Sequence, residues 1–119
     1  MEQSITKFIS TANWYLEKYP KAPNAAEIKF RVGRLYYLTN NFAPAEKHFK
    51  DIVKDHSNTK FSEYSANLLL DIYSLKKDYA GLMKVGNELL TNKAIASSKL
   101  GNEIRAVVEK SSFKYAETL

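Results

Sequence analysis

The side chains best suited to chemistry in this sequence are two histidines, His48 and His56. They stand eight residues apart, which is about two turns of a helix, so they cannot share a metal ion unaided. We expect each to be a solvated surface imidazole. The sequence contains no cysteine, which excludes disulfides, thiolate zinc sites and a cysteine nucleophile. We therefore expect neither a metal nor a cofactor.

The carboxylates stand among lysines at spacings typical of a solvated helix surface. Glu46 with Lys50 and Asp51 with Lys54 are three or four residues apart, the separation at which opposite charges pair along a helix. No Gly-rich segment forms a phosphate-binding loop. No pair of ionisable groups falls in an evident apolar pocket, where catalytic pKa values are usually shifted. The sequence predicts that the protein is not an enzyme.

The elements that must position these groups are helices. The chain has 119 residues, 45% of them hydrophobic, with only 4 Gly and 3 Pro. This length and composition predict one all-α domain, residues 1–119, with short loops. One helical face, recognised by its i, i+3, i+7 spacing, recurs three times at a period of 37 residues. Its members are Ile5, Phe8, Ala12, Tyr15 and Leu16; Phe42, Ala45, Phe49, Ile52 and Val53; and Tyr79, Leu82, Gly86, Leu89 and Leu90.

A second family of helices alternates with the first. Together the two patterns predict helices at about 4–18, 24–39, 43–55, 61–76, 79–91 and 97–114. In repeat terms these are a half-repeat at 1–20, full repeats at about 23–57 and 60–93, and a terminal helix at about 97–114. Asn24 is a candidate helix cap, and the pair Asn40-Asn41 can adopt a left-handed conformation at a helix end.

The middle repeat resembles the tetratricopeptide (TPR) family, and residues 15–25 followed by 32–37 look like its longer-period bacterial type. The matching residues are Val32-Gly33, Tyr36, Phe42, Ala45 and Phe49. The resemblance implies a right-handed superhelix of about six antiparallel helices, a TPR-like α-solenoid. Gly33 is expected where two helices approach closely, because a glycine inside a helix otherwise costs about 1 kcal/mol relative to alanine.

The resemblance also implies a function. In this family the first helix of each pair lines a concave groove, so the chain is expected to be a non-catalytic scaffold or adaptor that binds a peptide or protein there. The groove residues expected on this basis are Glu27, Phe30, Arg34, Tyr37, Tyr64, Asn67, Asp71 and Lys99.

The net charge of +5 favours an acidic partner. Ten basic and six acidic residues fall in positions 1–60, so most of the excess lies in the first half. Weak nucleic-acid binding through this half is an alternative, which we disfavour because the lysines are scattered singly among acids.

A further alternative is self-assembly through the end helices. Trp14 and Phe30 lie off the repeating face, and Phe113 and Tyr115 extend the last helix, so all four are expected to be exposed unless something covers them. Unpaired end helices would also suit a segment of a longer array. No run of roughly 20 apolar residues is present, so we expect a soluble protein without a membrane span, either cytoplasmic or periplasmic.

Overall fold

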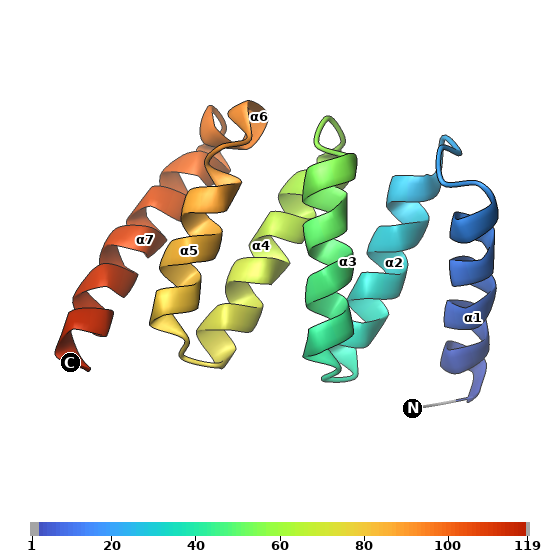
Figure 1. Ribbon diagram of the computed structural model, residues 1–119, viewed down its shortest axis with the longest axis horizontal. Coiled ribbons are helices and arrows are strands. Elements are labelled where there is room, and N and C mark those ends of the chain that lie inside the picture. The colour runs from blue at the N-terminus through green and yellow to red at the C-terminus, as the bar shows by residue number, and fades with distance from the viewer. Residues whose placement is uncertain (1–2, 119) are drawn as a thin grey trace.

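The computed structural model describes residues 3–118 and, within them, contains seven α-helices and no strand. The all-α prediction is therefore confirmed. The helices form a flat row of 44 × 31 × 18 Å in which neighbours run in opposite directions (Figure 1). Their bounds are α1 (Gln3–Lys18), α2 (Ala25–Leu38), α3 (Phe42–Asp55), α4 (Lys60–Leu75), α5 (Tyr79–Leu89), α6 (Lys93–Ala96) and α7 (Lys99–Glu117).

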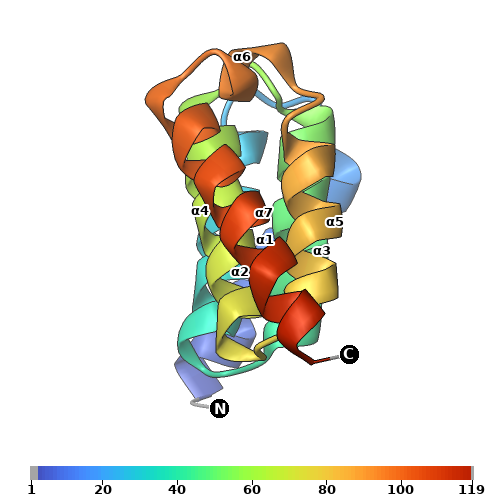
Figure 2. The ribbon, with the colours of Figure 1, turned by 90° about the vertical axis from the view of Figure 1, so that its left-hand side faces the viewer.

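Viewed along the row, α2 and α4 lie in one layer, and α3 and α5 lie in the other (Figure 2). Most buried side chains belong to one cluster shared by α3, α4 and α5, which includes Phe49, Leu69 and Ile72. A smaller cluster of Ile9, Ala12 and Val32 joins α1 to α2. The core thus consists of two clusters along the row, and the smaller one holds α1 at the end.

Six of the seven helices were predicted, with ends that differ from the structure by at most three residues. The short helix α6 was missed, and the predicted helix at 97–114 begins instead at Lys99 and ends at Glu117. The Asn92 side chain starts α6 by accepting hydrogen bonds from the amides of Ala94 and Ile95. Ile95 is completely buried and anchors this extra turn in the core.

Gly33 allows α2 and α3 to approach closely, as predicted. A Cβ atom added to Gly33 would lie 2.8 Å from Cε1 of Phe49 and 3.1 Å from Cβ of His48. Carbon atoms make favourable contacts at about 3.5–4.0 Å, so one added methyl group would require the Phe49 ring or the two helices to shift.

Two of the loops turn on residues in the left-handed region. Asn40 has a φ of 63°, as predicted, and Lys77 has a φ of 54° at the matching loop one period later.

The prediction that the Asn24 side chain caps α2 is wrong. Asn24 does precede α2, but its side chain caps no amide there, and its Oδ1 accepts a hydrogen bond from the Tyr15 hydroxyl at 3.3 Å. Within residues 3–118, no helix is long and apolar enough to cross a membrane.

Candidate partner-binding groove

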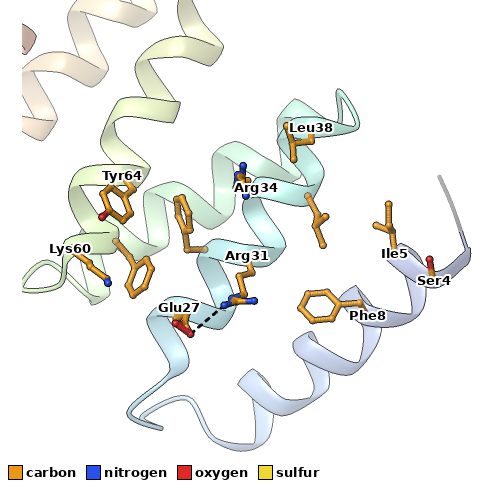
Figure 3. Close-up of a pocket in the computed structure, with 12 residues that line it drawn as sticks. Ser4, Ile5, Phe8, Glu27, Arg31, Arg34, Leu38, Lys60 and Tyr64 are labelled. Carbon is orange, nitrogen blue, oxygen red and sulfur yellow. Dashed lines mark ion pairs between the residues drawn. The ribbon is translucent and has the colours of Figure 1, made fainter.

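An open groove of about 630 Å³ lies where α1, α2 and the first turns of α4 meet (Figure 3). The first helices of two successive pairs, α2 and α4, supply most of its wall, and α1 supplies the opposite edge. The lining residues are Ser4, Ile5, Phe8, Glu27, Phe30, Arg31, Arg34, Leu35, Leu38, Lys60, Phe61 and Tyr64.

Aromatic rings form part of the groove wall between α2 and α4. The Phe30 ring lies 5.8 Å from the ring of Phe49, 5.6 Å from that of Phe61 and 5.8 Å from that of Tyr64. These separations are those of favourable aromatic pairs. Phe30, which was expected to be exposed unless something covered it, is half-buried because these three rings cover it. Tyr64 remains 48% exposed and presents its ring to the groove.

The charged residues of the groove are three cations and one carboxylate. Arg31 pairs with Glu27 at 3.8 Å along α2. Lys60 stands over the Phe61 ring, with its Nζ atom 5.4 Å from the centroid. Arg34 is exposed and has no ion-pair partner among residues 3–118. The groove thus combines apolar surface with an excess of positive charge.

The structure gathers half of the predicted groove residues at this site. Glu27, Phe30, Arg34 and Tyr64 line the groove, whereas Tyr37, Asn67, Asp71 and Lys99 do not. The last four are spread along the row. Asn67 and Asp71 are exposed on α4, and Lys99 is the first residue of α7.

Tyr37 and Asp71 pair with each other. The Tyr37 hydroxyl donates a hydrogen bond to Asp71 and so ties α2 to α4. This bond to a carboxylate, together with partial burial and the Asp71 charge, raises the pKa of Tyr37, because ionised tyrosine would lose the hydrogen bond and face a like charge.

Sequence reasoning missed the α1 edge of the groove. It assigned Phe8 to the packed face that it shares with Ala12, but Phe8 is 43% exposed while Ala12 is buried. The repeat pattern identifies positions that pack when a helix has neighbours on both sides. Among the described residues, α1 has a neighbour only on its α2 side (Figure 1). The sequence signal that could have identified the exposure of Phe8 is the position of α1 as the first helix of the row.

A second polar cluster joins α3 to α4 outside the groove. The predicted pair Glu46–Lys50 is present at 2.8 Å, and Lys76 also approaches Glu46 at 3.7 Å. Tyr73 donates a hydrogen bond to Glu46 as well. Burial tends to raise the pKa of Glu46, but hydrogen bonds from Lys50 and Tyr73 outweigh it, so that this pKa is lowered. The cluster joins the two helices and lies outside the groove.

Asp51 pairs with Lys29 of α2 at 3.3 Å. No ion pair joins it to Lys54 in the described part of the chain, so this predicted pairing is wrong. Asp51 pairs with Lys29 across the two helices because α2 and α3 approach closely at Gly33.

His48 is not the solvated imidazole that the sequence predicted. It is half-buried beside Tyr36, with ring centroids 5.5 Å apart, and its Nδ1 donates a hydrogen bond to the Pro44 carbonyl at 2.9 Å. Burial lowers the pKa of His48 because the charged ring loses water. His56 is half-buried at the end of α3. Residues 3–118 contain no cluster of three His, Cys, Asp or Glu side chains that could hold a metal ion.

The aromatic side chains at the two ends of the row are exposed as predicted. Trp14 on α1 is 57% exposed, and Phe113 and Tyr115 on α7 are 67% and 39% exposed.

No protein-family model, curated protein or solved structure matches this chain.

Proposed function

We propose that the chain is a non-catalytic interaction module that binds a protein or peptide partner in the groove between α1, α2 and α4. The observation that carries the proposal is the composition of that groove. The exposed rings of Phe8 and Tyr64 line the groove together with the cation Arg34, which has no ion-pair partner within residues 3–118. Aromatic anchors and arginine are the residue types that contribute most to binding at protein interfaces.

We further propose that the fold is a TPR-like α-solenoid of the longer-period type, with a right-handed superhelical course, and that the protein acts as a scaffold or adaptor. The alternation of helices between two layers supports this, as does the close approach at Gly33. A stacked array of this kind has no single central cavity, so its ligands bind along a surface groove.

The partner that fits this groove is acidic. Three cations and one carboxylate line it, so an acidic segment would gain attraction that a basic one would not. A partner that inserts an apolar side chain between Phe8 and Tyr64 would also bury surface that water now covers.

Panning a peptide library displayed on phage against the folded protein tests this function. Selected peptides should be enriched in acidic and aromatic residues, and Arg34→Glu should weaken their binding about tenfold or more while the helical circular dichroism spectrum stays unchanged. Lys110→Glu, on the exposed surface of α7, is the matched control and should bind as the wild type does. Selected peptides that bind Arg34→Glu and the wild type equally would contradict groove binding.

A second candidate function is self-assembly through the end helices, favoured by the exposure of Trp14 and Phe113 at opposite ends of the row. Sedimentation equilibrium over a wide concentration range tests it. A mass that rises with concentration, and no longer rises after Trp14→Ser, would support assembly through α1. A constant monomer mass would exclude it.

A further inference from the structure

The face of α1 that carries Phe8 and Thr11 corresponds to a face that is packed on the other two helices of its type. Positions 37 residues after these two are Ala45 and His48 on α3, and a further 37 residues on are Leu82 and Val85 on α5. Ala45, Leu82 and Val85 are at most 4% exposed, and His48 is half-buried. Phe8 is 43% exposed and Thr11 is exposed. We call the surface of Phe8 and Thr11 the open face of α1.

On α3 this face packs against the preceding helix of the row. His48 and Phe49 both lie beside Gly33 of α2, and Ala45 is one turn away on the same side of α3. The open face of α1 is therefore shaped for a helix that would lie against α1 as α2 lies against α3.

The adjoining surface of α2 has the same relation to α4. Tyr64 of α4 packs against Phe30 of α2, which is the contact between first helices of successive pairs. Position 27 of α2 corresponds to Tyr64, and position 31 corresponds to Leu68. These positions hold Glu27 and Arg31, which line the groove opposite Phe8. One more helix of the row would rest on both surfaces at once.

We propose that the groove binds an amphipathic α-helix of a partner protein, with acidic residues flanking its apolar face, and that this helix packs against the open face of α1 as an additional helix of the row. This inference deepens the proposed function and rests on it. It specifies both the conformation of the partner and the side of the groove that binds most strongly.

The charges around this position favour an acidic helix. Lys7 and Lys18 are exposed and eleven residues apart, about three turns, so they flank the open face on one side of α1. On the opposite side stand Arg31 and Arg34 of α2. Glu27 is the one carboxylate that lines the groove, and it is paired with Arg31. A helix with glutamates along both edges of its apolar stripe would meet cations on each side.

Three fluorescein-labelled model peptides test the inference by fluorescence anisotropy. Each has sixteen residues, the length of α4. The first carries leucines at i, i+3, i+4 and i+7 spacing with flanking glutamates, the second replaces the glutamates with lysines, and the third is the acidic peptide with two central prolines that prevent a helix. We expect saturable binding of the acidic helix, at least tenfold weaker binding of the lysine peptide, and comparable loss with the proline peptide.

Variants locate the binding face. Phe8→Ser and the double change Lys7→Glu with Lys18→Glu should each weaken the acidic helix about tenfold. Phe8 and the two lysines are exposed, so these variants should fold. Circular dichroism and thermal unfolding check that they do. Phe113→Ser and the double change Lys110→Glu with Lys114→Glu are the matched controls on α7 and should leave binding unchanged.

The outcomes separate this inference from the proposed function. Equal binding of the helical and proline peptides, or binding that depends on Tyr64→Ala but not on Phe8→Ser, would overturn the added helix and leave groove binding standing. Self-association of the wild type that Phe8→Ser abolishes would identify a second copy as the occupant and also overturn it. Failure of the acidic helix to bind, while phage-selected peptides bind in an Arg34-dependent way, overturns the inference alone. Absence of any Arg34-dependent binder overturns both.

Discussion

Tyr37 on α2 donates a hydrogen bond to Asp71 on α4, thirty-four residues further along the chain. The two side chains join the first helices of successive pairs, just as Phe30 and Tyr64 do near the opposite ends of the same helices. Two residues expected to contact a partner thus contact each other. The proposed binding surface is therefore the groove at the end of the row that includes α1.

Removing the Tyr37 hydroxyl should affect stability and leave partner binding unchanged. Tyr37→Phe is expected to lower the free energy of unfolding by about 0.5 kcal/mol, the low end for a hydrogen bond, because the pair is largely solvated. The pKa of Tyr37 is raised in the wild type. A spectrophotometric titration of the variant should therefore lack one tyrosine that ionises at a higher pH than an ordinary tyrosine. Urea unfolding and absorbance at alkaline pH measure the two effects. A tenfold loss of peptide affinity in Tyr37→Phe would contradict this prediction and show that Tyr37 contributes to binding.

Closing the gap at Gly33 should destabilise the fold. Gly33→Ala gains about 1 kcal/mol of helix propensity but adds a methyl group 2.8 Å from Phe49, and overpacking of this kind costs about 1–3 kcal/mol. We expect a net loss of up to about 2 kcal/mol in thermal or urea unfolding. Asn87→Ala, on the exposed face of α5, changes propensity without a new contact and is the control. A Gly33→Ala variant more stable than the wild type would show that α2 and α3 can move apart freely.

The buried hydroxyls of Ser62 and Ser65 are expected to cost stability. Both side chains are 0% exposed, and neither oxygen has a hydrogen-bond partner within residues 3–118. Because a buried unpartnered polar group is unfavourable, Ser65→Ala should raise the free energy of unfolding by about 0.5–2 kcal/mol. Ser74→Ala on the exposed surface of α4 should gain only the smaller propensity term. Destabilisation by Ser65→Ala would mean that the hydroxyl is bonded in solution.

Stability should fall in mild acid because of His48. Burial depresses the pKa of His48 in the folded protein, whereas in the unfolded chain a histidine titrates near about 6.5. Below that pH the unfolded state binds a proton that the folded state does not. The free energy of unfolding should therefore decline as the pH falls below the unfolded pKa, and level off once the pH is below the folded pKa.

Urea unfolding at pH 7.5 and pH 5.5 measures this dependence. His48→Gln should reduce the difference in stability between the two conditions, and His56→Gln is the matched histidine control that should retain it. An unchanged difference in His48→Gln would assign the pH dependence to another group.

The positions of the main helices were predictable because their apolar spacing extends over several turns. Phe49 follows this periodicity and lies against Gly33, so the sequence located one close approach of two helices. Helix α6 could not be found in this way. It is four residues long and depends on one side-chain cap at Asn92, too short for any periodicity to appear.

The groove was predictable only on its α2 and α4 wall. There, Glu27, Phe30, Arg34 and Tyr64 fall at positions implied by the family resemblance. The α1 edge was not predicted, because the exposure of Phe8 depends on which helices adjoin α1. A sequence pattern assigns a residue to one face of its helix but does not show whether another helix packs against that face. The pairing of Tyr37 with Asp71 was missed for a similar reason. The two residues are 34 positions apart, and their contact depends on how α2 and α4 are offset along their axes.

The most direct measurement of partner binding at this groove is an amide chemical-shift map of the ¹⁵N-labelled protein titrated with the acidic model helix. We predict that the shifted resonances will belong to the lining residues of α1, α2 and α4, from Phe8 through Arg34 to Tyr64, and will saturate together. Shifts confined to α5 and α7, or no shifts at peptide concentrations of about 1 mM, where even weak complexes form, would contradict binding at the groove.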